Sequence, residues 1–192
     1  PYTDPIDPSV ITIARRPPGL PLAATKVNSS DVGITINNNN IRNSAFRFAW
    51  FYVYRDGEYS TLSVHSILAP YNTTSETYDV IELVAPLGEH IEQDVQRVVF
   101  AVIYADGEKA FEIKTWDKAN ADDAAAIEDH NDGIQPLTYY FTNNDVDTPI
   151  SDVAKAKPFD SIPLLTETLE VANNRLFLGN NLLGYDTPLV TS

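Results

Sequence analysis

The feature that most constrains the fold is the stretch of residues 45–66, AFRFAWFYVYRDGEYSTLSVHS. It begins with a run of strongly β-forming residues, continues through Arg-Asp-Gly-Glu, and ends in a run that alternates polar and apolar residues. Asp-Gly between two such runs is the strongest short-range signal for a β-hairpin, because both central turn residues must adopt a positive φ. We therefore predict two antiparallel strands joined by a tight turn at Asp56 and Gly57.

The first strand of this hairpin is apolar on both faces, since alternate residues of a strand share a face. One face carries Phe46, Phe48, Trp50, Tyr52 and Tyr54, and the other carries Arg47, Ala49, Phe51 and Val53. A strand of this kind lies centrally in a sheet, or beneath a second layer or a partner. Aromatic residues inside strands are more often core than ligand platform, so we predict that the aromatic face is core.

A related hairpin signal occurs 50 residues later, where Tyr104-Ala-Asp-Gly-Glu matches Tyr54-Arg-Asp-Gly-Glu. Each motif follows a long apolar run. We predict a second turn at Asp106 and Gly107, with the two hairpins at one end of a β-sandwich rather than in a solenoid repeat.

Further strands are predicted at residues 32–36, 78–85, 95–104, 109–116 and 137–142. Short strands separated by turn signals over about 100 residues are typical of immunoglobulin-like or fibronectin type III-like sandwiches. We assign this all-β sandwich to residues 30–117. One short helix is predicted at residues 117–129, where an Ala-rich run follows early acidic residues.

Extended segments are predicted at both ends of the sandwich. Residues 1–29 are proline-rich and read as an arm, with one short strand at 10–15 that can lie along a sheet edge of its own domain or of a neighbour. Residues 118–192 would hold the inserted helix, a β-hairpin and a C-terminal extension, with a strand ending near 178 and a turn at 179–181. The chain contains no Met, so we expect a processed product or a fragment of a longer protein.

Composition narrows the classes of function. The net charge of −14 argues against nucleic acid, whose binding requires clustered Lys and Arg, and against anionic membrane surfaces. No Cys is available for a disulfide, a thiolate metal site or a nucleophile. No apolar run approaches the roughly 18 residues of a membrane helix.

Motifs for catalysis or metal binding are not evident. The three histidines, His65, His90 and His130, fall on different elements, and no nucleophile elbow, phosphate loop or HExxH motif is present. Asp129, Asn131 and Gly133 resemble a Ca²⁺ loop only superficially, because the glycine stands one place early and no bidentate Glu follows. We expect neither an enzyme nor a metal or cofactor site.

Two other classes of function stay open from the residues. A carbohydrate-binding or adhesin module would use Trp50, Trp116 or exposed tyrosines as stacking platforms. An acidic hydrolase would need two carboxylates that converge in a cleft, one of them with a raised pKa.

Three segments occur together in a characteristic order: RRPPGLPLAATKV (15–27), FRFAWFYVYRDGEYSTLSVHS (46–66) and NNRLFLGNNLLGYD (173–186). This set resembles large virion proteins of tailed phages, especially crAss-like phages of Bacteroidetes, described as tail stabilisation, nozzle or muzzle proteins. The chain departs from their pattern at Val64-His65, where a proline usually precedes the serine. The resemblance implies a fibronectin type III-like module located in the virion, with a structural role and no catalysis.

The resemblance also implies an assembly role in which the arm and the tail contact neighbouring subunits. The expected partners are other virion proteins or copies of this chain in a homo-oligomeric ring. The candidate contact residues are Val10, Ile11, Ile13, Arg15, Arg16, Pro17 and Pro18 in the arm, and Arg175, Phe177 and Tyr185 in the tail.

Overall fold

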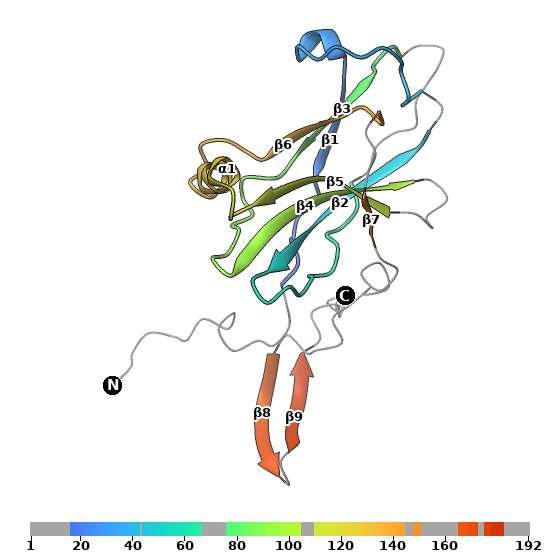
Figure 1. Ribbon diagram of the computed structural model, residues 1–192. Helices are drawn as coiled ribbons and strands as arrows, with labels where there is room; N and C mark the ends of the chain where they lie inside the picture. Colours follow the sequence, from blue (N-terminus) through green and yellow to red (C-terminus); the bar gives the residue numbers. More distant parts are fainter. Residues whose placement is uncertain are drawn as a thin grey trace, which may run out of the picture. The chain divides into compact units, whose positions relative to one another are not determined.

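The computed structural model describes residues 16–42, 44–66, 76–104, 110–144 and 148–150, together with the backbone of two strands nearer the C-terminus. The chain divides into two compact units, Pro17–Pro158 and Pro1–Arg16 with Phe159–Ser192. In the first unit, two antiparallel sheets and one short helix form a β-sandwich (Figure 1). The predicted all-β sandwich is therefore confirmed.

One layer is a three-stranded sheet with the order β1-β3-β6. It consists of β1 (Ala23–Val27), β3 (Val80–Val84) and β6 (Thr138–Phe141). Because β1 precedes residue 30 and β6 follows residue 117, the sandwich reaches beyond the predicted bounds 30–117 on both sides.

The strand predicted at residues 32–36 is not formed. Instead the chain makes a 3-10 helix (Ser29–Asp31), and the N–H of Ile34 bonds back to the Ser29 carbonyl at 2.9 Å. The Asp79 carboxylate accepts from the Ser29 N–H at 2.6 Å and from its hydroxyl at 2.8 Å. These bonds hold the start of this segment in a turn, so its apolar alternation does not become a paired strand.

The second layer is a four-stranded sheet with the order β2-β4-β5-β7. Its strands are β2 (Phe46–Tyr54), β4 (Val95–Tyr104), β5 (Ala110–Asp117) and β7 (Thr148–Pro149). Strand β7 was not predicted, because two residues carry no periodic signal.

Strands β2 and β4 run antiparallel, with Phe46 opposite Tyr104 and Tyr54 opposite Val95. The two Asp-Gly motifs directly follow the C-terminal ends of these strands, and those ends lie at opposite ends of the sheet. The prediction of two hairpins at one end of the sandwich is therefore wrong. Residues 105–109, with Asp106 and Gly107, lie outside the described residues.

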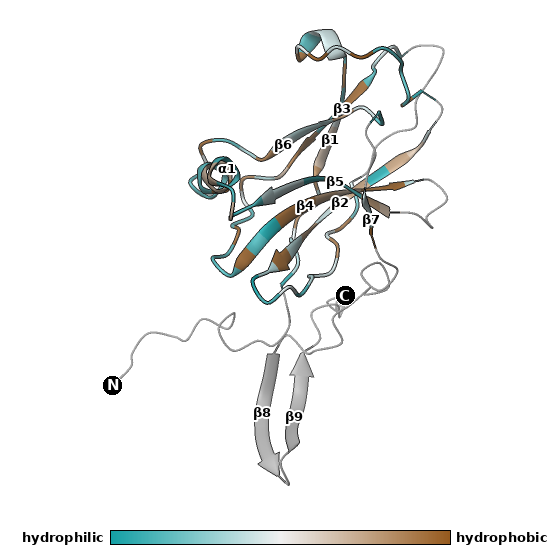
Figure 2. Ribbon diagram, in the orientation of Figure 1, coloured by the Kyte–Doolittle hydropathy of each residue, from teal (hydrophilic) through white to brown (hydrophobic). Residues whose placement is uncertain are grey.

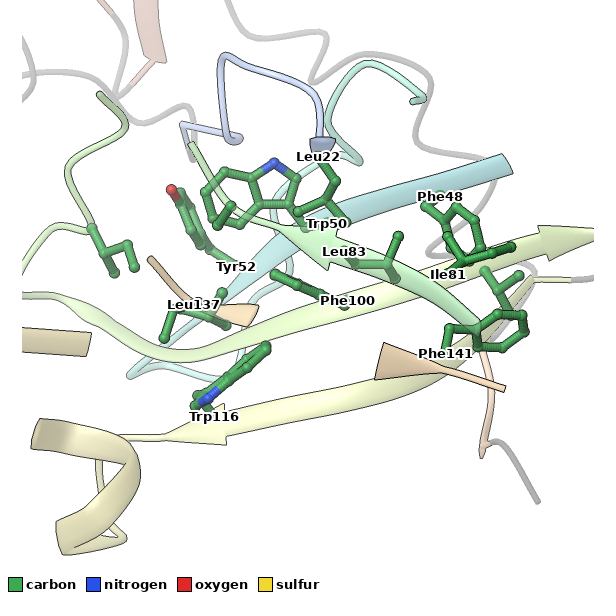
Figure 3. Close-up of a cluster of buried hydrophobic side chains, with 14 of the residues drawn as sticks. Leu22, Phe48, Trp50, Tyr52, Ile81, Leu83, Phe100, Trp116, Leu137 and Phe141 are labelled. Carbon is green, nitrogen blue, oxygen red and sulfur yellow. The ribbon is translucent and has the colours of Figure 1, made fainter. Parts of the chain in front are cut away.

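The main core fills the space between the two sheets. Trp50 and Phe100 are fully buried there, and Leu22, Leu83 and Leu137 close around them (Figure 3). The aromatic face of β2 contributes all five of its side chains to this cluster, which confirms its prediction as core. Hydrophobic residues, brown in Figure 2, are prominent on β2 and β4.

The opposite face of β2 is buried as well. Ala49, Phe51 and Val53 join Val99 and other residues of β4 in a second cluster, against which Tyr59 and Leu62 pack. Strand β2 is therefore covered on both faces, but it is the outer strand of its sheet and not a central one.

The helix α1 (Ala121–Asn131) starts later than the predicted 117–129. Asn120 caps it, because its side-chain oxygen accepts from the N–H groups of Asp122 (2.9 Å) and Asp123 (3.3 Å). Asp117 belongs to β5 instead.

In the second unit, β8 (Leu165–Ala172) and β9 (Arg175–Leu182) form an antiparallel hairpin. The turn predicted at 179–181 is wrong, because Gly179 and Asn181 pair with Thr168 and Thr166 inside the hairpin.

Candidate interaction surfaces

The turn after β2 is formed at the predicted residues but has a different geometry. The Gly57 N–H bonds to the Tyr54 carbonyl at 2.9 Å, and the Tyr54 N–H bonds to the Glu58 carbonyl at 2.8 Å. Gly57 has a φ of 83°, whereas Asn143 is the one non-glycine residue with positive φ in the described part of the chain. Asp56 therefore does not have the predicted positive φ, and the loop is a type I turn closed by a glycine bulge.

Residues 59–66, here called the serine segment, do not form the predicted regular strand. Beyond one bridge between Val53 and Tyr59, backbone hydrogen bonds to β2 are made by every third residue. The backbone N–H groups of Ser60, Ser63 and Ser66 bond to the carbonyls of Tyr52, Trp50 and Phe48 at 2.8–2.9 Å. The three serine hydroxyls accept from the N–H groups of the same three β2 residues at 2.9–3.1 Å.

Each serine thus satisfies both backbone groups of one β2 residue, and all three serines are buried. Two of the hydroxyls also donate to the next carbonyl, from Ser60 to Thr61 at 2.8 Å and from Ser63 to Val64 at 3.0 Å. An exposed row of backbone groups on an outer strand is a template for pairing with another chain. The serine segment closes this edge of the four-stranded sheet.

Strand β6 presents an open edge. The Ala85 N–H bonds to the Leu137 carbonyl at 2.9 Å, which sets the phase of the ladder between β3 and β6. Successive residues of an antiparallel strand turn their backbone groups to alternate sides. Thr138 and Tyr140 therefore direct theirs away from β3, where no other described strand pairs with β6.

A cavity of about 490 Å³ lies along this edge. We call it the Asn–Tyr pocket. It is lined by Ile34, Thr35, Ile36, Asn37, Asn38, Tyr139, Tyr140, Thr142 and Asn144. Burial raises the pKa of the Tyr140 hydroxyl, and the negative charge and hydrogen bond of the Glu82 carboxylate raise it further.

The beginning of β6 is held by a buried histidine. His130, on α1, contacts the Glu89 carbonyl through Nε2 at 2.9 Å and accepts from the Leu137 N–H through Nδ1 at 3.4 Å. Because the Leu137 N–H can only donate a hydrogen bond, Nδ1 must accept it. The proton of the neutral imidazole ring therefore lies on Nε2. Burial lowers the pKa of His130, against the opposing effect of Glu89.

From Pro17 onward, the arm belongs to the sandwich unit. Leu22 is in the main core, Pro18 is buried, and the Leu20 carbonyl accepts from the Trp50 indole at 2.8 Å. Among the predicted contact residues, Arg16 is exposed and Pro17 half-buried. Pro18 is thus buried within the sandwich, and Val10, Ile11, Ile13 and Arg15 lie outside the described residues.

The β8–β9 hairpin has two unlike faces by register. By register, one face carries three aliphatic pairs, Leu165–Leu182, Leu169–Leu178 and Val171–Leu176, with Glu167 and Asn180 between the first two. The predicted contact residues Arg175 and Phe177 fall on the other face, opposite Ala172 and Glu170. Tyr185 lies outside the described residues.

The tryptophans are not a ligand platform. Trp50 is 0% exposed and Trp116 5% exposed, so neither offers a ring face to a sugar. A carbohydrate-binding module in which tryptophans stack on the sugar is therefore excluded. Stacking on the tyrosines of the Asn–Tyr pocket stays open.

The acidic residues around α1 do not gather into a cation site. The side-chain amide of Asn131 is bonded to the backbone of Ile91. Its oxygen accepts from the Ile91 N–H at 2.8 Å, and its nitrogen donates to the Ile91 carbonyl at 2.9 Å. Within the described residues, no group of three or more His, Cys, Asp or Glu is placed to hold a metal ion. The described part of the chain also has no helix long and apolar enough to cross a membrane.

Comparisons of the chain with protein-family models, with curated proteins and with solved structures gave no match. The three features that sequence reasoning missed are the serine segment, the aliphatic face of β8–β9 and the Asn–Tyr pocket. The first has a visible signal, Ser-x-x-Ser-x-x-Ser at 60–66, whose period of three is that of neither a strand nor a helix.

Proposed function

We propose that the chain is a non-enzymatic structural module of a virion protein of a tailed phage, and that it contacts neighbouring subunits. The observation that carries this proposal is the aliphatic face of the β8–β9 hairpin. A two-stranded hairpin is at best marginally stable in water, and an apolar face on it needs a surface to pack against. Such a surface on another virion protein, or on a second copy in a ring, gives the hairpin an assembly role.

The segments that carry the sequence resemblance support this proposal. They correspond to β1 with the residues that pack under Trp50, to β2 with the serine segment, and to β9. The likeness to tail proteins therefore falls on structural elements, one of which is half of the proposed contact hairpin.

We also propose that the sandwich has an immunoglobulin-like or fibronectin type III-like topology. In immunoglobulin domains strands B and E are neighbours in one sheet, and strands C, F and G follow one another in the other. Here β1 and β3 correspond to B and E, and β2, β4 and β5 correspond to C, F and G. Trp50 on β2 matches the buried tryptophan of strand C. These correspondences support an immunoglobulin-like or fibronectin type III-like module.

Sedimentation velocity of the full chain over a range of concentrations tests the assembly role. Leu169→Asp places a charge on the aliphatic face, and Thr168→Asp places the same charge on the opposite face one residue away. We expect Leu169→Asp to abolish association, because a buried unpaired carboxylate is strongly unfavourable. Thr168→Asp should leave it nearly unchanged. A chain that stays monomeric throughout, or equal effects of the two variants, would contradict self-assembly.

Truncation separates the arm from the sandwich. Deleting residues 1–15 should weaken association and leave the circular dichroism and thermal unfolding of the sandwich unchanged. Deleting residues 1–22 should unfold it, because Leu22 is a core residue and Leu20 bonds Trp50. Full association after the shorter deletion would show that the arm has no role in assembly.

A further inference from the structure

We propose that the Asn–Tyr pocket binds a neutral saccharide. The cavity is about 490 Å³, within the roughly 300–1,000 Å³ that is typical of small-molecule sites. One wall is the segment 34–38, and the other is β6 with Thr142 and Asn144. The inference concerns ligand binding and is independent of the assembly role proposed above.

The lining has the chemistry of a sugar site. Amides come from Asn37, Asn38 and Asn144, and hydroxyls come from the threonines and tyrosines of the pocket. Amides supply both donors and acceptors, and hydroxyls do the same, which matches the hydroxyl groups of a sugar ring. Within the described residues, the amides of Asn37 and Asn38 have no hydrogen-bond partner in the protein, and both side chains are exposed.

Charge selects against other ligands. The chain as a whole has a net charge of −14, yet none of the described residues that line the pocket is charged. Phosphates and carboxylates are recognised by Arg, Lys or helix N-termini, and hard cations are bound by carboxylates. A neutral polyhydroxylated molecule needs none of these groups.

The two walls are held together before any ligand binds. Asn143 donates to the Asn40 carbonyl at 3.0 Å and accepts from the Tyr104 hydroxyl at 2.7 Å. Asn40 in turn donates to the Asn144 side chain, and Asn39 donates to the Tyr78 carbonyl at 2.8 Å. The run of four asparagines is thus divided. Asn39 and Asn40 fix the wall, and Asn37 and Asn38 line the pocket.

The tyrosines supply the apolar part of the site. Tyr139 and Tyr140 are neighbours on a strand, so they lie on opposite faces of it and the pocket follows the strand edge. The hydroxyl of Tyr140 is held by Glu82, which restrains its ring. A half-buried ring of this kind can pack against the C–H face of a sugar, as aromatic side chains with one apolar and one polar end commonly do.

The open edge of β6 adds backbone groups. Tyr140, which lines the pocket, directs its N–H and carbonyl away from β3. Backbone groups that point into a pocket contribute orientation and specificity to small-molecule binding. A saccharide there would satisfy backbone groups for which the described residues provide no neighbouring strand.

The test is a titration of the full chain, by isothermal calorimetry and saturation-transfer NMR, with glucose, galactose, N-acetylglucosamine, maltose, lactose and cellobiose at millimolar concentrations. We expect binding of at least one of these neutral sugars. Asn37→Ala and Asn38→Ala should each weaken it about fivefold, the effect of losing one ordinary hydrogen bond. Tyr140→Ala should weaken it by about tenfold or more.

The matched control is Asn28→Ala, which removes an asparagine of the same region that does not line the pocket. Its affinity should equal that of the wild type. Circular dichroism confirms that each variant is folded, and the exposed positions of Asn37 and Asn38 keep the test valid if Tyr140→Ala is unstable. The proposal is overturned if no sugar binds, if the pocket variants bind like the control, or if glucuronate or sialic acid binds more tightly than the neutral sugars.

Discussion

Strands β2 and β6 each form the outer strand of a sheet, yet they differ in what lies beside their outward-facing backbone N–H and carbonyl groups. On β2 every such group between Phe48 and Tyr52 is bonded to the serine segment. On β6 the outward groups of Tyr140 face the side of the Asn–Tyr pocket. The comparison shows that one molecule can block strand addition at one edge and keep another edge available for contact.

The difference follows from where each strand stands in the core. Strand β2 supplies Phe46, Phe48, Trp50, Tyr52 and Tyr54 to the main cluster, so opening its edge would expose Trp50 and its neighbours. Strand β6 is only four residues long and is held at its start by His130. An open edge is less hazardous on a strand that is short.

The largest expected effect comes from removing single backbone N–H groups from β6 by substitution with proline. Tyr139 bonds to β3, so Tyr139→Pro should destabilise the sandwich by about 3 kcal/mol or more relative to Tyr139→Ala. Tyr140 faces outward, so Tyr140→Pro should cost much less relative to Tyr140→Ala, since edge strands tolerate proline there. Urea unfolding measures both differences. Equal costs at the two positions would show that the β6 edge is not open.

The closed edge of β2 is tested by Ser63→Val, which removes the hydroxyl that accepts from the buried backbone N–H of Trp50. We expect the free energy of unfolding to fall by about 1–3 kcal/mol, the cost of an unsatisfied buried donor. Thr138→Val at the open edge removes only a long bond of 3.3 Å to the Pro136 carbonyl, and should cost less. If the two substitutions proved equally mild, the serine hydroxyls would not be what closes β2.

Acid should distinguish the two edges, because serine hydroxyls do not titrate and His130 does. The pKa of His130 is lowered from its ordinary value of 6.5, so the folded protein resists protonation that the unfolded chain accepts. Stability should therefore fall as pH drops below about 6.5 and level off below the folded pKa. In His130→Gln, which retains a donor and an acceptor, the slope between pH 7 and pH 5 should be smaller.

His65, whose pKa is also lowered by burial and by Arg47, is present in both proteins. The difference between their slopes therefore reports His130 alone. Identical slopes would mean that folding does not lower the pKa of His130.

The smallest effect concerns the turn that leads into the serine segment. Gly57→Ala should destabilise the protein by about 1–2 kcal/mol, because φ is 83° and the cost is backbone strain rather than a clash. Gly88 is a matched control, since it has no positive φ and only Leu20 Cδ1, at 4.0 Å, near an added Cβ. Gly88→Ala should be close to neutral in thermal unfolding. A neutral Gly57→Ala would show that this turn does not set the register of the segment.

Much of the sandwich could be predicted from local pattern. Strands β2, β3, β4 and β5 are runs with clear β character, and their existence does not depend on distant partners. Strand β1 has a weak sequence signal, because AATKV is short and weakly apolar. It forms a strand because it pairs with β3. Residues 32–36 had the better alternation, but Asp79 holds the chain before them in a turn.

The surfaces were harder to predict, because they depend on pairings between distant residues. Asn143 and Asn40 are far apart in sequence, so no local pattern shows that they bond. The unlike faces of β8–β9 depend on a register that only the pairing reveals. The sequence of the serine segment resembles that of an alternating strand, because a polar residue at every third position and one at every second position both place polar residues among apolar ones.

The serine segment advances three residues for every two on β2, as the matching of Ser60 with Tyr52 and Ser63 with Trp50 shows. A deletion of one residue between two serines would displace every later serine from its partner. A deletion or duplication of a whole Ser-x-x unit, matched by two residues of β2, would keep all remaining bonds. Related chains that differ in the length of this segment should therefore differ by multiples of three residues. Any other change in length would shift the later serines away from their hydrogen-bond partners on β2.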